Sequence, residues 1–329
     1  MRLVVTGGAG FIGSHFVRSL LRGGYAGISD PSVTVIDNLS YAGNLSNLAP
    51  VADDPRFTFV QGDILNDTLV DDTIIGADAV VHFAAESHVD RSIEGSHDFI
   101  MTNVVGTHAL LESARRNGLG RFLHVSTDEV YGSIDEGSWD ETFPLEPNSP
   151  YAASKASSDL VARSYARTHE LDVVITRCSN NYGPYQFPEK IIPLFVTNLI
   201  EGQRVPLYGD GLNIRDWLHV SDHCRGIAMA LVGGRAGEIY NIGGGTELTN
   251  RELTSKLLDA CGGSWDDVDL VEDRKGHDRR YSLDITKISE ELGYRPQVSL
   301  DSGLVETVQW FHDNEAWWKP LKTRAALAR

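Results

Sequence analysis

Tyr151 and Lys155 lie four residues apart in the segment Tyr151-Ala-Ala-Ser-Lys155, at the start of a predicted helix. Residues at this spacing share one face of a helix, so the phenol and the ammonium group should lie side by side. A nearby ammonium favours the phenolate and lowers the tyrosine pKa from its usual value of about 10. We therefore expect Tyr151 to act as a base toward an alcohol that is about to be oxidised.

A second group of reactive side chains, Thr127, Asp128 and Glu129, follows a predicted strand over Arg121–Ser126. Parallel sheets place their chemistry at the carboxyl ends of strands, so these side chains should face a ligand. Two carboxyl groups buried close together have their pKa values pushed apart, which gives one acid and one base. In isolation, the acidic pair could equally begin a solvated loop.

The chain opens with Thr6-Gly7-Gly8-Ala9-Gly10-Phe11-Ile12-Gly13, between a predicted strand and a predicted helix. In a dinucleotide-binding fold the first glycine of this spacing permits a tight turn, and the second lets the backbone approach a pyrophosphate. The third lets helix and strand pack closely, and the free N–H groups at the helix start attract phosphate. The sequence therefore predicts a nucleotide site here.

Asp37 ends the second predicted strand, where a dinucleotide fold places the carboxylate that binds the adenosine ribose hydroxyls. A carboxylate there repels a 2′-phosphate and no arginine follows directly, so the sequence favours NAD over NADP. Gly62-Asp63-Ile64, after the third strand, is similarly placed to flank an adenine. The alternative for Asp37 is a turn-forming residue after a strand.

These side chains need a scaffold, and the first half of the chain alternates short β-branched runs with helical patterns. The alternation predicts an α/β fold with a Rossmann-type, doubly wound parallel sheet. The predicted strands are Leu3–Thr6, Val33–Asp37, Phe57–Gln61, Ala79–Phe83, Arg121–Ser126 and Asp172–Arg177. The predicted helices of this half are Phe11–Arg22, about 96–117 and about 151–169.

After Arg177 the pattern becomes irregular, beginning with a turn-rich loop at 180–184. The elements predicted here are a strand at Trp217–Val220 and helices at Lys190–Glu201, His223–Val232, Asn250–Cys261, Thr286–Leu292 and Leu300–Asn314. We expect an NAD-binding domain over residues 1–179, joined by roughly 215–241, and a smaller α/β substrate-binding lobe over 180–329. Ligands of such folds lie where the two lobes meet.

The composition argues against several classes of protein. Of 329 residues, 41% are hydrophobic and 23% charged, as in an ordinary globular chain, and the formal charge of −17 argues against nucleic-acid binding. No run approaches the ~20 apolar residues that span a bilayer, and the amino terminus leads straight into a strand. We therefore expect a cytoplasmic protein without membrane contact.

Metal and disulfide sites are not indicated either. Cys178, Cys224 and Cys261 lie far apart and suit buried hydrophobic positions. His88 and Asp90 are too few to form a metal site by themselves, so we expect no metal.

Together, the glycine loop and the Tyr151/Lys155 pair resemble the short-chain dehydrogenase/reductase superfamily, in its extended nucleotide-sugar branch. Thr127-Asp128-Glu129 before Val-Tyr-Gly is similar to the active-site set of the dTDP-glucose 4,6-dehydratases. Sugar epimerases of this branch usually lack the acidic pair. The likeness covers essentially the whole chain, through segments 84–92, 180–185, 209–211, 214–217 and 274–278.

The resemblance implies a dehydration in three stages. Tyr151 takes the proton of the sugar C4 hydroxyl while hydride passes to NAD, and the Thr127 hydroxyl binds the reacting oxygen. Glu129 then removes the C5 proton, Asp128 protonates the departing C6 hydroxyl, and hydride returns to C6 while a proton is delivered to C5. The implied product is dTDP-4-keto-6-deoxyglucose, an intermediate of deoxysugar biosynthesis.

The same resemblance implies two sets of binding residues. Those expected to hold NAD are Gly7, Gly10, Phe11, Ile12, Gly13, Asp37, Asn38, Ser40, Asp63, Ile64, Phe83, Ala84, Ala85, Thr102, Tyr151, Lys155 and Asn181. Those expected to hold the nucleotide sugar are Ser87, Thr127, Asn180, Lys190, Ile191, Pro206, Tyr208, Arg215, Asn250, Arg274, His277 and Tyr281. Arginine suits a diphosphate through its bidentate guanidinium, although the basic run 273–280 could also be a solvated loop or form ordinary ion pairs.

Two other functions remain open. A nucleotide-sugar 4-epimerase would return hydride to C4 without loss of water, and an idle NAD-binding regulator would not turn over at all. The acidic pair argues against the first, and the joint presence of all five catalytic residues argues against the second. The helices near 96–117 and 151–169 resemble those that pair between subunits in this superfamily, so we expect a homodimer.

Overall fold

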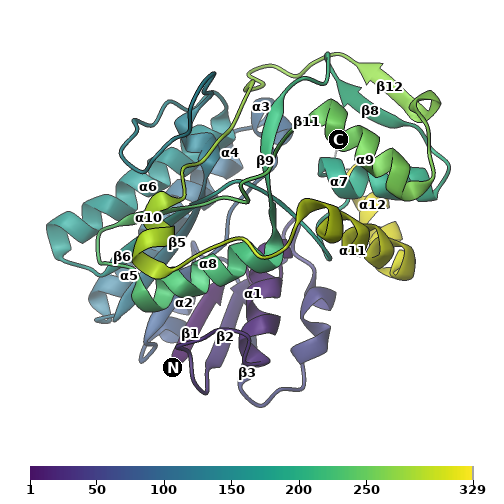
Figure 1. Ribbon diagram of the computed structural model, residues 1–329. Helices are drawn as coiled ribbons and strands as arrows, with labels where there is room; N and C mark the ends of the chain where they lie inside the picture. The colour runs from purple at the N-terminus through teal and green to yellow at the C-terminus, as the bar shows by residue number, and fades with distance from the viewer. Residues whose placement is uncertain (328–329) are drawn as a thin grey trace.

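A seven-stranded parallel sheet forms the centre of the molecule (Figure 1). The computed structural model describes residues 1–327, with side chains described through Arg324. The strands lie in the order β10-β6-β5-β4-β1-β2-β3, which confirms the predicted Rossmann-type sheet. Their bounds are β1 Arg2–Thr6, β2 Ser32–Asp37, β3 Phe57–Gln61, β4 Ala79–His82, β5 Arg121–Thr127, β6 Val173–Cys178 and β10 Ile239–Ile242.

Helices cover both faces of this sheet. One face carries α1 (Phe11–Leu21), α8 (Val220–Gly233) and α10 (Thr286–Leu292). The other carries α2 (Asp67–Ile74), α5 (Thr107–Arg116) and α6 (Pro150–His169). Because both faces are covered, successive residues of one strand are buried in opposite directions, as Val80 and Val81 of β4 show.

The strand order reverses between β1 and β4, which makes this place the switch point of the sheet. Connections leave the two strands toward opposite sides, so a crevice opens beyond their carboxyl ends, where folds of this kind bind ligands. Thr6, Ile36 and His82 lie in register on β1, β2 and β4. The loops that follow these strands therefore start at one edge.

A smaller lobe lies beyond this edge and is built from the second half of the chain (Figure 1). It contains a three-stranded sheet in the order β11-β9-β7 and a parallel pair, β12-β8. Its apolar side chains form a separate core that includes the fully buried Phe311 and Trp318. Its elements are β7 Asn180–Tyr182, β8 Val205–Tyr208, β9 Ile214–His219, β11 Glu247–Thr249, β12 Val268–Val271, α7 Ile191–Ile200, α9 Asn250–Cys261, α11 Leu300–Asp313 and α12 Glu315–Leu327.

The structure corrects the helix predicted over 96–117. Two short helices, α3 (Val89–Glu94) and α4 (His97–Phe99), precede a π-helical turn over Ile100–Gly106, and α5 begins only after this turn. Within the turn, the Asn103 side-chain amide accepts from Glu86 N and donates to Glu86 O. It also donates to Ser154 Oγ at 2.8 Å. These tertiary bonds stabilise a wide turn for which the sequence pattern carries no signal.

Other boundaries also differ from the prediction. β9 starts three residues before the predicted strand at 217, and α8 starts directly after it because His219 Nδ1 caps the helix by accepting from Ser221 N. The elements α2, α12, β8, β10, β11 and β12 were not predicted, and the loop predicted at 180–184 contains the strand β7 because residues 180–182 pair with β9. Within the predicted joining range 215–241, the start of β10 is part of the large sheet and α8 packs against that sheet. β9, in contrast, pairs with strands of the second lobe. The division into 1–179 and 180–329 stays a proposal, and residues 328–329 lie outside the described residues.

A buried ion pair lies under α6 and links it to β5 and β6. Arg177 Nε donates to Asp159 Oδ2 at 2.8 Å, and His124 Nε2 lies 3.3 Å from Asp159 Oδ1. Burial alone would raise the pKa of Asp159, but the Arg177 guanidinium and His124 hold that pKa at about 2. The stability that this carboxylate contributes is therefore complete above about pH 4, the usual aspartate pKa, and is lost as the pH falls toward about 2.

We expect Asp159→Ala to lower the free energy of unfolding by about 3–5 kcal/mol at neutral pH, because it leaves the Arg177 charge buried without its partner. Asp269→Ala is the control, since its pair with Arg204 is half exposed and should contribute about 1 kcal/mol or less. Urea denaturation followed by circular dichroism measures both losses. Equal losses in the two variants would contradict the importance of the buried pair.

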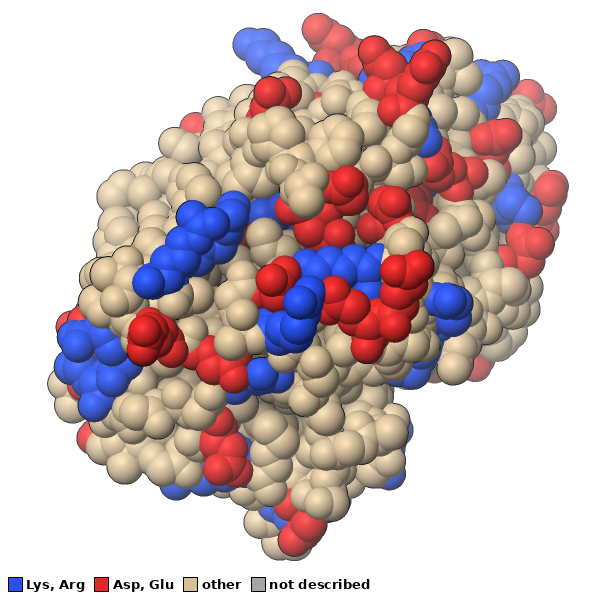
Figure 2. Space-filling view, turned by 60° about the vertical axis from the view of Figure 1, so that its left-hand side comes forward, with Lys and Arg blue, Asp and Glu red and all other residues tan. Residues whose placement is uncertain are grey.

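Charged side chains of both signs are mixed on the molecular surface. On the face shown in Figure 2, Lys and Arg lie among Asp and Glu. Exposed ion pairs elsewhere in the chain, such as Arg279–Asp210 at 2.9 Å, are of the same kind. None of the helices in residues 1–327 combines the length and the hydrophobicity that a membrane-spanning helix requires.

Candidate active site and cofactor cavity

A cavity of about 430 Å³ lies at the carboxyl edge of the large sheet. Residues at or after the ends of β1, β2, β4, β5 and β6 line it, together with residues of α7, β8 and β9 from the second lobe. All the predicted site residues line this cavity except Tyr281. The structure thus brings the glycine loop, the acidic pair, Tyr151 with Lys155, and the basic side chains together at one site.

The glycine loop after β1 forms a tight cradle in the cavity wall. Gly7 has a φ of +68°, and a Cβ there would lie 2.5 Å from the backbone nitrogen of Ala84. A Cβ on Gly13 would lie 2.4 Å from the Gly7 carbonyl oxygen. Gly10 precedes α1 without a side chain to cap it, so the first N–H groups of the helix stay available to an anion. This arrangement fits a pyrophosphate.

Asp37 ends β2 beside the glycine loop. Its Oδ2 accepts from Ala9 N and its Oδ1 accepts from Leu39 N, each at 2.9 Å. Burial raises the pKa of Asp37 above its usual value, and the two backbone donors oppose that shift. Asn38 Nδ2 donates to Asp63 Oδ2 at 3.0 Å, which joins the ends of β2 and β3. The group offers the acceptors and donors that ribose hydroxyls and an adenine require.

Thr127 is the last residue of β5 and lines the cavity. A single 3₁₀ turn over Asp128–Tyr131 follows it. Thr127 Oγ1 accepts from Glu129 N at 3.2 Å and donates to Asp128 Oδ1 at 3.3 Å. One hydroxyl therefore orients both members of the acidic pair.

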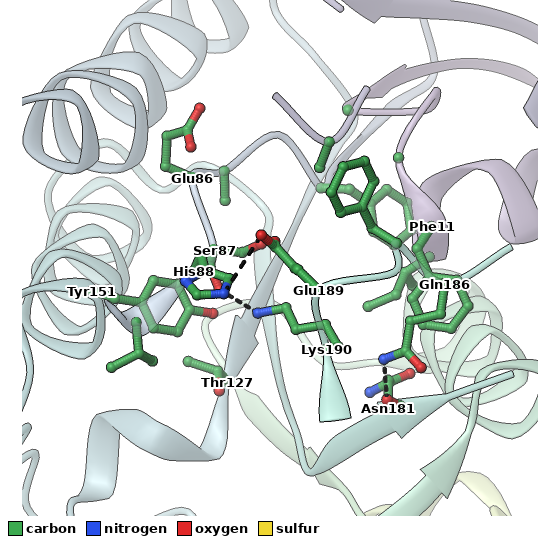
Figure 3. A pocket seen from close by; sticks show the side chains of 18 of the residues that line it. Phe11, Glu86, Ser87, His88, Thr127, Tyr151, Asn181, Gln186, Glu189 and Lys190 are labelled. Atoms are coloured by element: carbon green, nitrogen blue, oxygen red, sulfur yellow. Dashed lines mark hydrogen bonds and ion pairs between the residues drawn. The ribbon is translucent and has the colours of Figure 1, made fainter. Parts of the chain in front are cut away.

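Tyr151 and Lys155 reach the same place from the first turns of α6. Ser149 caps this helix, because its hydroxyl accepts from Ala152 N at 3.1 Å, and Pro150 occupies the first position. Tyr151 and Thr127 lie on the same side of the cavity (Figure 3), and hydrogen bonding by the Thr127 side chain opposes the rise that burial causes in the pKa of Tyr151.

The electrostatic environment of Tyr151 differs from the prediction. Lys155 directs its ammonium group at Val125 O, 2.8 Å away, and burial lowers the pKa of Lys155 to about 8. Burial and the charge of Glu129 raise the pKa of Tyr151 well above its usual value, although the bond with Thr127 opposes them. The predicted lowering of the tyrosine pKa is therefore wrong for this cavity, and a phenolate needs further positive charge beside it.

The pKa values of both carboxyl groups of the acidic pair are raised, but different charges surround the two groups. Burial raises the pKa of Asp128 well above its usual value, and the charges of Glu129 and Asp216 raise it further. Burial also raises the pKa of Glu129, but Arg274 and Lys190 oppose that shift. Neighbouring carboxylates thus favour the protonated form of Asp128, whereas the basic side chains favour the ionised form of Glu129.

Comparison with known proteins agrees with this geometry. The family described as GDP-mannose 4,6 dehydratase matches residues 4–307. A dTDP-glucose 4,6-dehydratase of Streptomyces niveus is 63% identical over 323 residues, which are 98% of this chain and 96% of that protein. DesIV, a dTDP-glucose 4,6-dehydratase from Streptomyces venezuelae solved with NAD bound, is 66% identical, with a TM-score of 0.97 over 98% of this chain and 100% of that one. The chain belongs to the dTDP-glucose 4,6-dehydratase family.

This membership confirms the resemblance seen in the sequence. The wider superfamily shares the architecture of this dehydratase family at lower identity. A UDP-glucose 4-epimerase from Thermotoga maritima is 33% identical, with a TM-score of 0.87 over 96% of this chain and 100% of that one.

In this member of the dTDP-glucose 4,6-dehydratase family, basic side chains line the wall made by the second lobe. Arg215 Nη2 donates to Asp278 O at 2.8 Å, and its guanidinium lies 4.1 Å from the centroid of the Tyr281 ring. Tyr281 donates to Asp278 Oδ2 at 2.7 Å and supports Arg215 from behind. It does not line the cavity, so its predicted place among the substrate contacts is wrong. Arg274 Nη1 lies 3.6 Å from Asp90 Oδ1, and its buried Nε has no hydrogen-bond partner among the described residues.

His277 stands beside these arginines as a neutral group. Burial and the charge of Arg274 lower the pKa of His277 to about 4, although its Nδ1 lies 2.6 Å from Asp273 Oδ1. At neutral pH it can therefore hydrogen-bond a ligand without adding a charge.

Side chains that bridge the cavity were missed by the sequence analysis. Glu189, next to α7, accepts from the Tyr41 hydroxyl and lies 3.5 Å from His88 Nε2 (Figure 3). Gln186 Nε2 donates to Asn181 O at 2.8 Å. Glu189 directly precedes the predicted Lys190, and Gln186 lies five positions after the predicted Asn181, so closeness to a predicted residue is the signal that could have found them.

Proposed function

We propose that the chain catalyses the NAD-dependent dehydration of dTDP-glucose to dTDP-4-keto-6-deoxyglucose and water, a step of deoxysugar biosynthesis. The observation that carries this proposal is the acidic pair, the buried Asp128 and the half-buried Glu129, which the Thr127 hydroxyl orients and which lines the same cavity as Tyr151. Oxidation of an alcohol needs one acid/base group, whereas loss of water needs two more, and the cavity provides three. Relatives named dTDP-glucose 4,6-dehydratase, 63% identical over nearly the whole chain, support the choice of substrate.

The part of the cavity nearest the glycine loop suits NAD. The loop and the start of α1 would hold the pyrophosphate, and Asp37 would hold the adenosine ribose. When bound, NAD supplies a centre that accepts a hydride and returns it, and its oxidised form adds positive charge to the cavity. Solved dTDP-glucose 4,6-dehydratases with NAD, from Streptomyces venezuelae and Bacillus anthracis, support this cofactor.

The three acid/base groups divide the proton transfers among them. We assign the proton of the C4 hydroxyl to Tyr151, the C5 proton to Glu129, and the proton given to the departing C6 hydroxyl to Asp128. The charges around the two carboxyl groups support the roles of Glu129 as a base and Asp128 as an acid. Asp128 holds a proton that it can donate, whereas Arg274 and Lys190 favour the ionised Glu129 that a base requires.

The remaining lining residues suit the nucleotide sugar. Ser87 and Asn180 line the same cavity as the acidic pair, and Lys190 Nζ donates to Ser87 O at 2.8 Å. Guanidinium groups match a diphosphate through paired N–H donors. The residues that we propose for the diphosphate and nucleoside are Ile191, Pro206, Tyr208, Arg215, Asn250, Arg274 and His277, with Tyr281 supporting Arg215.

The deciding experiment is a mass spectrum of dTDP-glucose after incubation with the purified protein, with dTDP-galactose and UDP-glucose run in parallel. Loss of one water from dTDP-glucose, without net accumulation of reduced cofactor, is the expected result. An unchanged mass with an altered sugar would instead show an epimerase. No change of any sugar, with NAD bound, would show an idle binding protein.

Gly7→Ala is expected to weaken NAD binding about tenfold or more, because its Cβ would lie 2.5 Å from the Ala84 backbone. Gly118→Ala is the matched control, since its φ of +63° is similar but the space around its Cβ is open. Titration of the NAD-stripped proteins with NAD measures both affinities. Equal affinities would show that the close approach at Gly7 does not shape the site.

We also propose a homodimer that pairs through the helices of 96–117 and 151–169. Ile100, Val105 and Leu160 are 44%, 38% and 55% exposed on these helices, large apolar side chains that a dimer would bury. Light scattering should give twice the chain mass of 36.1 kDa, and Leu160→Glu should shift the protein toward the monomer. A wild-type monomer at micromolar concentration would refute the dimer. We also propose a cytoplasmic protein without membrane contact, and the net charge of −17 supports the further expectation that it does not bind nucleic acid.

A further inference from the structure

The C-terminal helix α12 has two faces that contact different parts of the molecule. Trp317, Leu321 and Arg324 follow one another at intervals of four and three residues, so they share one face of the helix. Trp318 and Lys322 share a second face. The second face meets α11 and α7 beside α12 (Figure 1). The first meets the loop after β2, and its Trp317 also packs against Trp310 and Phe311 of α11.

The second face anchors α12 in the smaller lobe. Trp318 is fully buried, and its Nε1 donates to Phe311 O at 2.7 Å at the end of α11. Lys322 Nζ lies 2.5 Å from Glu201 Oε2, directly after α7. The helix is therefore a fixed part of the smaller lobe.

The first face is tied to the glycine loop through one asparagine. Trp317 Nε1 donates to Asn47 Oδ1 at 3.0 Å, and Asn47 Nδ2 donates to Ala9 O at 2.9 Å. Ala9 lies in the glycine loop, and its N–H donates to Asp37. Because Asn47 is only 2% exposed, this connection is shielded from water.

The same face also covers the loop that follows Asp37. Leu321 packs with Phe187, Tyr41 and Ala42 in one apolar cluster. Arg324 Nη2 donates to Ser40 O at 2.6 Å. Trp317 and Leu321 line the cavity together with residues 37–47, so α12 forms part of the wall around its adenosine end.

We infer that α12 is a clasp that retains the dinucleotide, with Trp317, Leu321 and Arg324 as its contact residues. The inference rests on the proposed function, since it assumes that a dinucleotide lies along the glycine loop with its adenosine ribose at Asp37. Retention suits the proposed reaction, because a cofactor that ends each turnover in its starting oxidation state need not leave. A helix fixed to one lobe and bonded to the loops of the other slows the opening through which the cofactor leaves.

The test measures how fast NAD leaves the holoenzyme. Arg324→Ala removes the bond to Ser40 from an exposed side chain, Trp317→Phe keeps an aromatic ring but removes the N–H donor, and Leu321→Ala removes the apolar contact. Thr323→Ala, exposed on the same helix and bonded only to Lys319 O among the described residues, is the matched control. Each protein is loaded with radiolabelled NAD and chased with an excess of unlabelled NAD.

We expect release about fivefold faster for Arg324→Ala and for Trp317→Phe, the range for one lost hydrogen bond, and about tenfold faster for Leu321→Ala. Thr323→Ala should behave as wild type. The melting temperature of NAD-stripped Arg324→Ala should stay within about a degree of the wild-type value, because the Arg324 side chain is exposed.

Wild-type release rates in Arg324→Ala and Trp317→Phe would overturn the clasp, even if Leu321→Ala released NAD faster with a lowered melting temperature. Faster release in these two variants, with the melting temperature kept, supports it. If the wild-type protein retains no labelled NAD, the proposed cofactor is wrong. If wild type and variants retain it equally, the cofactor stands and only the clasp is wrong.

Discussion

Replacement of Tyr151 by phenylalanine is expected to lower kcat by a factor of about 10²–10⁴, the range for loss of a positioned acid/base group. The variant loses the hydroxyl that bonds Thr127 but keeps the ring, whose centroid lies 6.4 Å from that of Phe99 in an edge-to-face contact. KM for dTDP-glucose should change little, because the phenol makes none of the proposed diphosphate contacts. Formation of the keto sugar, followed by mass spectrometry, measures turnover.

Tyr165→Phe is the matched control for this experiment. Tyr165 lies on the same helix α6, is also buried, and donates its hydroxyl to Glu112, outside the cavity. We expect it to keep wild-type turnover. If Tyr151→Phe turned over as fast as Tyr165→Phe, Tyr151 would have no part in the reaction.

The second large effect concerns the acidic pair, which Glu129→Gln and Asp128→Asn should separate into a base and an acid. Each substitution is expected to lower the rate of water loss by about 10²–10⁴. In heavy water, Glu129→Gln should also abolish deuterium incorporation at C5 of the sugar, because no base remains to remove that proton. Asp128→Asn should keep this exchange, because Glu129 still works while the departing hydroxyl lacks its proton donor.

Mass spectrometry and proton NMR of the recovered sugar nucleotide measure water loss and exchange together. Glu141→Gln is the control, since Glu141 is a partly buried carboxylate that accepts from Asn241 N away from the cavity. It should leave both rates unchanged. Exchange that survives in Glu129→Gln but disappears in Asp128→Asn would reverse the two assigned roles.

Six of the seven strands of the large sheet could be predicted closely because they are short runs rich in β-branched and apolar residues between turns, whereas β10 was missed. β2, for example, starts one residue before the predicted Val33 and ends at the predicted Asp37. The π-helical turn could not be predicted in this way. Its stabilising bonds join Asn103 to Glu86 and Ser154, 17 and 51 residues away, and no local pattern reports such contacts.

The site shows the same division between local and distant causes. Glycine spacing and strand ends place Gly7, Asp37 and Thr127 in the cavity, because each is fixed by the element next to it. Trp317 meets Asn47 across 270 residues, so its place at the cofactor end depends on how α12 packs. The sequence likewise shows the ammonium group near Tyr151 but not the depth of burial, and burial decides the direction of the pKa shift.

The position of the Thr127 hydroxyl bears on how the site is restored after each turnover. Conversion of the sugar to its keto form and water neither takes up nor releases a proton overall. With the roles proposed above, and with Glu129 returning its proton to C5, Tyr151 ends one cycle with one proton more and Asp128 with one proton fewer. The difference is cancelled by moving a single proton from phenol to carboxylate, and the Thr127 hydroxyl, bonded to both groups, provides a direct relay. The proton inventory thus closes inside the protein, so the cavity can work through the whole cycle without access to bulk water.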